Sequence, residues 1–570
     1  MRLIPLRLWA IAIFSGILQV LPFPIAGPTP LWRTAFCWVA ILPLLWALLS
    51  NDRSGKPLTL RQAAYLGYVC GFVWYMGNCY WIYQTMYLYG GLAKPIAAGI
   101  LVLFCLYLGL YHALFGTLIA AFRNRFGRQT ALLLVPFAWV AVELARARIT
   151  GLPWDLLGIA QADNPLLTRL APVTGAYGLS FVIAAVNALW LIRIRIRERR
   201  FTRPALTIAG VVIVVLYSAG LRLIADPKSS PTTARATLVQ ENLGVGAEAR
   251  GNNETTSQMV DSFSRLSLYP PADRCNGIPE LPSTACIHFL AEAHTGAGSI
   301  VPTDLIAWPE SPAGFRTDDP SFRERLAALA RAASAPLVIG SLGVVPDGST
   351  ARGVRVYDSA ALVTADGTSA GRYDKIHLVP WGEYVPFKKF FSFADKLTAG
   401  AGNMDRGTDR TIFRTAGHNF GVFICYESIF GDEVRQFVKN GAEVLVNISD
   451  DGWYGDTSAA WQHLNMVRMR AIENHRWILR STNTGVTAAI DPYGHVTVAA
   501  PRHIRTALRA GFNFEHSVTF YTIHGDLFAY ACAFIAALAL VFSLIGRAKN
   551  ASAPRPASKM WIQQSNAPMH

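Results

Sequence analysis

The sequence GVFICYE at residues 421–427 ends a short apolar run with one cysteine, Cys425. Because β-branched and aromatic side chains favour extended backbone, this run predicts a buried β-strand. A side chain at the end of such a strand is held by a rigid sheet, beside the loops that form pockets. A lone cysteine in this position is more often a small buried hydrophobic residue. Cys425 therefore indicates catalysis only if other reactive residues accompany it.

Two earlier segments also place an ionisable residue directly after a predicted strand. Glu310 ends DLIAWPE (304–310), and Lys375 opens the loop in YDKIHLVPWGEYVPF (373–387). Taken alone, the glutamate would be a helix cap or a solvated turn residue, and the lysine would belong to a basic loop. In the order Glu310, Lys375, Cys425 the three supply a base, a positive charge and a nucleophile. These are the groups that cysteine-based acyl transfer requires.

The segment around these residues alternates between predicted strands and helices, as in residues 321–333, which read as a helix. Strands that alternate with helices predict an α/β layered domain. A stretch rich in Pro and Gly at 269–298, which carries Cys275 and Cys286, interrupts the alternation and is interpreted as a surface insertion. The predicted strands are ATLVQEN (236–242), DLIAWPE (304–310), PLVIGS (336–341), SAALVTA (359–365), GVFICYE (421–427) and EVLVNIS (443–449).

The composition of the whole chain predicts a membrane protein with a second structural unit. Of its 570 residues, 52% are hydrophobic and only 16% are charged, and the mean hydropathy is +0.29. This average is too apolar for a soluble protein of this length. Runs long enough to cross a bilayer are read at 8–25, 34–50, 64–85, 95–121, 130–146, 173–192, 205–225 and 525–546.

The net charge of +15 comes largely from basic clusters between these runs, which report membrane orientation rather than nucleic-acid binding. Every second loop is basic, so both termini are expected in the cytoplasm and the long segment before the last run on the exported side. The stretch with Arg146 and Arg148 is the one basic loop on the exported side. The cytoplasmic clusters are Arg2 and Arg7; Arg53, Lys56 and Arg61; Arg123, Arg125 and Arg128; Arg193 to Arg203; and Arg547 to Lys559.

These patterns divide the chain into four parts. We expect a seven-helix transmembrane domain at 1–228, an exported catalytic domain at 229–515, a final transmembrane helix at 516–548 and a disordered cytoplasmic tail at 549–570. The fold class is thus a multispan α-helical membrane domain plus an α/β domain.

The remaining cysteines give no sign of a metal or a cofactor. Five of the eight fall inside apolar runs, where cysteine is usually buried: Cys37, Cys70, Cys79, Cys105 and Cys532. No CxxC pair or Cys/His cluster has the spacing of a metal site. Cys275 and Cys286, in an exported loop, are hypothesised to form a disulfide, with two free surface cysteines as the alternative.

The Glu310, Lys375 and Cys425 motifs together resemble the nitrilase superfamily, whose Glu-Lys-Cys triad lies on an α-β-β-α sandwich. The chain resembles in particular the membrane branch of that superfamily, the apolipoprotein N-acyltransferase family, in a multispan N-terminal half, one final helix and several motifs. One departure is the loop at 243–254, which lacks the tryptophan typical of this family. The motifs are HLVPWGEYVPF (377–387), ICYES (424–428) and NISDDGWYG (447–455).

The resemblance implies an activity and a set of supporting residues. Cys425 would take a fatty acyl group from a membrane phospholipid, by resemblance phosphatidylethanolamine, as a thioester. The α-amine of an apolipoprotein's diacylglyceryl-cysteine would then accept it. Glu383 would be a second active-site carboxylate, and Tyr426 and Glu427 would shape the pocket. The protein would lie in the bacterial inner membrane, with its catalytic domain in the periplasm and without a cofactor.

Two other functions remain open from the residues alone. A membrane-tethered amidase would use the same triad and resolve the thioester with water, whereas an inactive membrane assembly or transport protein would not use it. A separate hypothesis concerns four phenylalanines interleaved with two lysines, which would form a lid at the membrane surface or pack in the domain core. These residues are Phe387, Lys388, Lys389, Phe390, Phe391 and Phe393.

Overall fold

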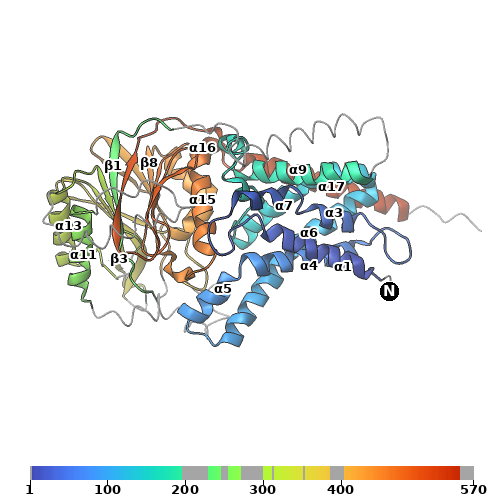
Figure 1. Ribbon diagram of the computed structural model, residues 1–570, viewed down its shortest axis with the longest axis horizontal. Helices are drawn as coiled ribbons and strands as arrows, with labels where there is room; N and C mark the ends of the chain where they lie inside the picture. Colours follow the sequence, from blue (N-terminus) through green and yellow to red (C-terminus); the bar gives the residue numbers. More distant parts are fainter. Residues whose placement is uncertain are drawn as a thin grey trace, which may run out of the picture.

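The computed structural model has two parts, one helical and one built on two β-sheets. The helical part lies at one end of the molecule and the two sheets lie together at the other (Figure 1). The helical part contains most of the N-terminal region together with the last helix, α17. The helix α15 lies between the sheets and the helical part (Figure 1). The structure describes residues 3–195, 229–245, 254–270, 300–310, 314–350, 353–384 and 404–551.

Within these residues, four stretches are long and apolar enough to cross a membrane: Leu31–Leu48, Lys94–Leu133, Ala176–Ile194 and Leu527–Ile545. These stretches agree with four of the predicted spans, and the predicted span at 205–225 lies outside the described residues. The helices of this part are α1 (Leu6–Val20), α2 (Leu31–Thr34), α3 (Leu42–Leu48), α4 (Leu60–Asn78), α5 (Trp81–Gln84), α6 (Lys94–Leu133), α7 (Val135–Ala145), α8 (Ala171–Thr174), α9 (Ala176–Arg195) and α17 (Leu527–Ala551).

The sequence predicted a basic loop between the fourth and fifth spans, and the helical backbone is interrupted in that region. Gly127, with a φ of 83°, divides α6 into two helical segments that meet at a kink. Glycine tolerates this conformation because it has no Cβ atom. Arg123 is buried, and its guanidinium donates hydrogen bonds to the carbonyl oxygens of Leu48 and Leu58. Arg123, one residue of the basic cluster, therefore also holds α6 against the loop that joins α3 and α4.

The second part is a four-layered α-β-β-α sandwich, as the resemblance predicted. One sheet has the order β12-β1-β2-β3-β4-β5 and the other β11-β10-β9-β8-β7-β6. The strands are β1 (Ala234–Gln240), β2 (Leu305–Ala307), β3 (Leu337–Pro346), β4 (Val354–Val363), β5 (Ser369–Asp374), β6 (Ile412–Thr415), β7 (His418–Ile424), β8 (Val444–Ser449), β9 (Ile478–Thr482), β10 (Ala488–Ile490), β11 (Val496–Ala499) and β12 (Thr506–Phe512).

Alternating side chains explain how each sheet is buried on both faces. Leu238 of β1 packs in the core between the sheets, whereas its neighbour Val239 packs against the outer helices α11 (Thr256–Leu268) and α13 (Pro320–Ala333). The other sheet is covered by α14 (Gly431–Lys439) and α15 (Ala459–Asn474). All six strands predicted from the sequence overlap observed strands, and the predicted helix at 321–333 lies in α13.

The basic loop that the sequence placed on the exported side is explained by contacts within the protein. Arg146 is 2% exposed, and its guanidinium donates to the Tyr75 hydroxyl at 3.3 Å. Arg148 forms two ion pairs. One is with Asp432 in the first turn of α14, and the other is with Asp526, directly before α17. Both arginines are thus used in contacts within the protein. Their presence in this loop therefore has a structural explanation and does not contradict the predicted orientation.

Several sequence-based hypotheses fall outside the described residues. These are the disulfide between Cys275 and Cys286, most of the insertion at 269–298, the phenylalanine and lysine lid at 387–393, and the tail beyond residue 551. They remain predictions. The five cysteines of the apolar runs are all buried free thiols, as predicted.

Candidate active site

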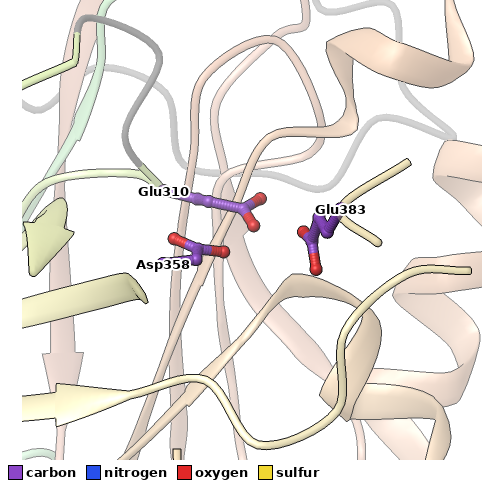
Figure 2. A group of neighbouring side chains, drawn as sticks. All are labelled: Glu310, Asp358 and Glu383. Carbon is purple, nitrogen blue, oxygen red and sulfur yellow. The ribbon is translucent and has the colours of Figure 1, made fainter. Parts of the chain in front are cut away.

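The structure brings together the three residues at the centre of the sequence prediction, with Lys375 in the middle. Its Nζ atom donates to Oε1 of Glu310 at 2.7 Å and to Oε1 of Glu383 at 2.6 Å. A third carboxyl group, that of Asp358 on β4, lies 3.0 Å from the same nitrogen. The Lys375 side chain is completely buried. The carboxyl groups of Glu310, Asp358 and Glu383 converge on this one space (Figure 2).

The close spacing of the three carboxyl groups would also suit a metal ion. Their oxygen atoms lie within 4.8 Å of one another. However, the ammonium group of Lys375 forms an ion pair with each of them. The Lys375 nitrogen thus already lies within 3.0 Å of all three carboxyl groups and offsets part of their negative charge.

Cys425 occupies a sharp turn directly after β7. Its φ of 46° lies in the left-handed region, which non-glycine residues rarely adopt and which is often found at functional sites. Burial and the negative charge of Glu310 raise the pKa of the thiol well above its ordinary value, while Lys375 and a hydrogen bond with Ser449 oppose this effect. The resting thiol is therefore protonated at neutral pH and requires a base.

Glu310, which the sequence predicts to be that base, is held in its ionised form. Burial raises the pKa of its carboxyl group, but the charge of Lys375 and several hydrogen bonds outweigh burial, so the pKa lies below its ordinary value. One of these bonds comes from the backbone N–H of Asp450, which donates to Oε2 at 2.8 Å. Glu310 is thus ionised at neutral pH and able to accept a proton.

Glu383 supports Lys375 from the opposite side. Its second oxygen, Oε2, accepts a hydrogen bond from the backbone N–H of Val379 at 2.8 Å, which fixes the carboxyl group in the loop. Burial raises its pKa, against the opposing charge of Lys375.

Glu427 connects the turn at Cys425 to the loop that carries Lys375. Its fully buried carboxylate accepts hydrogen bonds from the backbone N–H of Ile424 at 2.7 Å and of Ile376 at 2.7 Å. It also accepts from the N–H of His377 at 3.2 Å and from the Tyr373 hydroxyl at 2.7 Å. The carboxylate therefore ties the turn at the nucleophile to the loop that carries Lys375.

Tyr426 connects the nucleophile's turn to the helical part. Its hydroxyl donates to the carbonyl oxygen of Gly151 at 3.0 Å, and its ring packs edge-on against Phe430. The residue that follows Cys425 is thus held by the membrane-side loop, which couples the position of the nucleophile to the docking of the two parts.

Sequence reasoning missed a buried network beneath the nucleophile. His463 on α15 lies with Nδ1 2.9 Å from Asp451 and with Nε2 3.1 Å from the carbonyl oxygen of Cys425. Arg480 forms an ion pair with Asp451 at 2.6 Å. A charged residue directly after apolar residues in a strand, such as Arg480 after Ile478 and Leu479 in β9, was the available signal, since a buried charge requires a partner.

Sequence reasoning also missed Asp358. The predicted strand at 359–365 begins one residue after it, so Asp358 lay outside the predicted element. The observed strand β4 begins at Val354, and Ser359 pairs with Asp374 of β5. This register places Asp358 opposite the beginning of the Lys375 loop.

Comparison with known proteins gives separate matches for the helical part and for the sandwich. Residues 15–189 match the family model of the apolipoprotein N-acyltransferase N-terminal domain, and residues 274–515 match that of carbon-nitrogen hydrolases. An apolipoprotein N-acyltransferase of Geobacter metallireducens is 33% identical over 556 residues, which cover 96% of this chain and 97% of that protein. The chain belongs to the apolipoprotein N-acyltransferase family.

Other members of the family show similar coverage. The apolipoprotein N-acyltransferase of Methylococcus capsulatus is 33% identical, with 90% of this chain and 92% of that protein covered. Among solved structures, an amidase from Nesterenkonia sp. covers 53% of this chain and 97% of its own at 15% identity, with a TM-score of 0.34. Like its relatives in the apolipoprotein N-acyltransferase family, the chain is a bacterial membrane protein with a nitrilase-like domain.

Proposed function

We propose that this protein transfers a fatty acyl group from a membrane phospholipid to the α-amine of the diacylglyceryl-cysteine at the N-terminus of apolipoproteins. Membership of the apolipoprotein N-acyltransferase family supports the reaction class. The donor, by resemblance, is phosphatidylethanolamine. The observation that carries the catalytic assignment is the buried Lys375 ammonium, which pairs with Glu310 at 2.7 Å and interacts electrostatically with the Cys425 thiol.

In the first step, Glu310 removes the proton of the Cys425 thiol as the sulfur attacks the ester carbonyl of the phospholipid. The positive charge of Lys375 stabilises the thiolate and then the oxyanion of the tetrahedral intermediate. When the intermediate collapses, the C–O bond breaks and the leaving alkoxide takes the proton from Glu310. The products are a lysophospholipid and an acyl-thioester on Cys425.

In the second step, the α-amine of the apolipoprotein attacks the thioester carbonyl. Glu310 accepts a proton from the amine, and the C–S bond breaks so that Cys425 leaves as a thiolate, which Lys375 stabilises. The thiolate then recovers the proton from Glu310. Glu383 positions Lys375 in both steps, while Glu427 and Tyr426 hold the turn of the nucleophile.

We also propose the location of these parts. The Lys and Arg pattern supports a protein of the inner membrane, with domain boundaries at 1–228, 229–515 and 516–548 and the catalytic domain in the periplasm. The contacts of Arg146 and Arg148 within the protein support this orientation, because they account for the basic stretch that does not follow the pattern. Both lipid substrates would then reach the site from the adjacent bilayer.

The experiment that tests this function traps the acyl-enzyme. Purified protein is incubated with acyl-labelled phosphatidylethanolamine in the absence of an acceptor, and label on Cys425 is identified by its release with hydroxylamine. Cys425→Ala should abolish the adduct, whereas Cys532→Ala, which removes another buried cysteine, should retain it. Glu310→Gln and Lys375→Met should slow its formation on the order of a hundredfold, the effect of losing a base or an oxyanion-stabilising group.

The same preparation distinguishes the competing functions. Addition of a diacylglyceryl lipopeptide should move the label to the peptide amine. Undiminished labelling of Cys425→Ala would exclude the proposed nucleophile. Release of the label as free fatty acid, as fast as its transfer to the peptide, would favour the amidase-like hydrolase.

A further inference from the structure

The three carboxyl groups around Lys375 pose a charge problem. With all three ionised, the cluster would carry a net charge of −2 in a buried site. A buried charge without a counter-charge is costly, and a group in that position usually takes up a proton instead. At least one of Glu310, Asp358 and Glu383 is therefore expected to be neutral.

The hydrogen bonds of the cluster indicate which group holds the proton. Glu310 accepts a backbone N–H from Asp450, and Glu383 accepts one from Val379, in addition to the bond that each receives from Lys375. Hydrogen bonds of this kind favour an ionised carboxylate. Among the described residues, Lys375 is the one donor that forms a hydrogen bond with the Asp358 side chain. Asp358 is also the most buried of the three, with 5% of its side chain exposed.

Asp358 also lies beside Glu310. Carboxyl oxygens of the two groups lie within 4.8 Å of each other, and a proton held between them favours the ionised form of Glu310 and the protonated form of Asp358. Two carboxyl groups at this separation share one proton, because like charges so close to each other disfavour double ionisation. The groups that face Asp358 are Lys375, Glu310 and Glu383.

We propose that Asp358 is a positioning residue that stays protonated, donates its proton in a hydrogen bond to Glu310 and accepts one from Lys375. In this state it holds the base and the cation at a fixed separation without adding a negative charge. Lys375 then remains available to stabilise the oxyanion, and Glu310 remains ionised to accept the proton of the thiol. The inference rests on the proposed roles of Glu310 and Lys375.

The replacement Asp358→Asn tests this assignment, because asparagine keeps one acceptor for Lys375 and one donor for Glu310 and is neutral at every pH. Acylation of Cys425 should stay within about threefold of the unmodified protein, and the acid limb of its pH profile should move by less than about one unit. Asp358→Leu, which has a similar size but no polar atoms, should lose on the order of a hundredfold. Asp366→Asn, in an exposed turn, is the matched control for the loss of one carboxyl group.

Infrared spectroscopy provides a readout that does not depend on activity. The difference spectrum between the unmodified protein and Asp358→Asn at neutral pH should contain the carbonyl band of a protonated carboxyl group. Absence of this band, a loss in Asp358→Asn as large as that in Asp358→Leu, or a shift of the acid limb by one unit or more would overturn the inference. Asp358→Asn decides the matter even if Asp358→Leu does not fold. Failure of the proposed function would instead be seen as acylation of Cys425→Ala.

Discussion

The indole Nε1 of Trp154 donates a hydrogen bond to Oε1 of Gln462 at 2.9 Å, which joins a loop of the helical part to α15 of the catalytic domain. Both side chains are almost completely buried. The amide nitrogen of Gln462 donates in turn to the carbonyl oxygens of Pro24 and Asn78. One side chain of the catalytic domain therefore forms hydrogen bonds with three residues of the helical part.

Gln462→Leu should weaken this docking, because it leaves the buried donor of Trp154 and two carbonyl oxygens without partners. Each such loss costs roughly 1–3 kcal/mol, so a clear decrease in thermal stability in detergent is expected. Gln436→Leu, on the half-buried face of α14, is the control. An unchanged melting temperature in Gln462→Leu would show that this contact does not hold the two parts together.

Glu427→Gln should impair both stability and acylation. The carboxylate accepts four hydrogen bonds with two oxygens, and a glutamine would turn one of these acceptors into a donor that faces N–H groups. We expect a lower melting temperature and a loss of acylation of about tenfold or more, since unsatisfied buried donors cost roughly 1–3 kcal/mol each. Glu324→Gln, on the exposed face of α13, should change neither quantity. Normal acylation in Glu427→Gln would contradict the role assigned to this residue.

The thiol of Cys425 should react slowly with a small neutral alkylating reagent at pH 7. Burial and Glu310 raise its pKa well above the ordinary value, so the thiolate fraction and the rate should increase as the pH rises through 9. Lys375→Met removes the cation that lowers this pKa and should slow alkylation at any given pH. The rate is measured by mass spectrometry against Cys425→Ala. A rate that levels off below pH 7 would show a preformed thiolate.

The proposed orientation predicts which positions react with a membrane-impermeant maleimide. In protein whose Cys275 and Cys286 are replaced by serine, Thr368→Cys should be labelled in cells with a permeabilised outer membrane. Lys56→Cys should be labelled only after lysis. Both positions are exposed, Thr368 before β5 and Lys56 between α3 and α4. Labelling of both from the same side would refute the predicted topology.

The sequence by itself determined the types of elements and the reactive residues that follow them. Apolar runs and β-branched runs are local patterns, so the spans, the six strands and the places of Glu310, Lys375 and Cys425 at strand ends could be read directly. The family motifs then indicated the sandwich, because they resemble those of the nitrilase superfamily. The predicted break before the fifth span coincides with Gly127, where the helical backbone is interrupted.

Only the tertiary structure decided which groups meet around those residues. The register of β4 against β5 places Asp358 beside Lys375, and no local pattern encodes that register. In the same way, Glu427 accepts hydrogen bonds from a loop about 50 residues away. Arg148 forms an ion pair with Asp432, which lies on a distant segment of the chain. Hydrogen bonds and ion pairs depend on distances of a few ångströms. Such distances arise only when segments remote in sequence pack together.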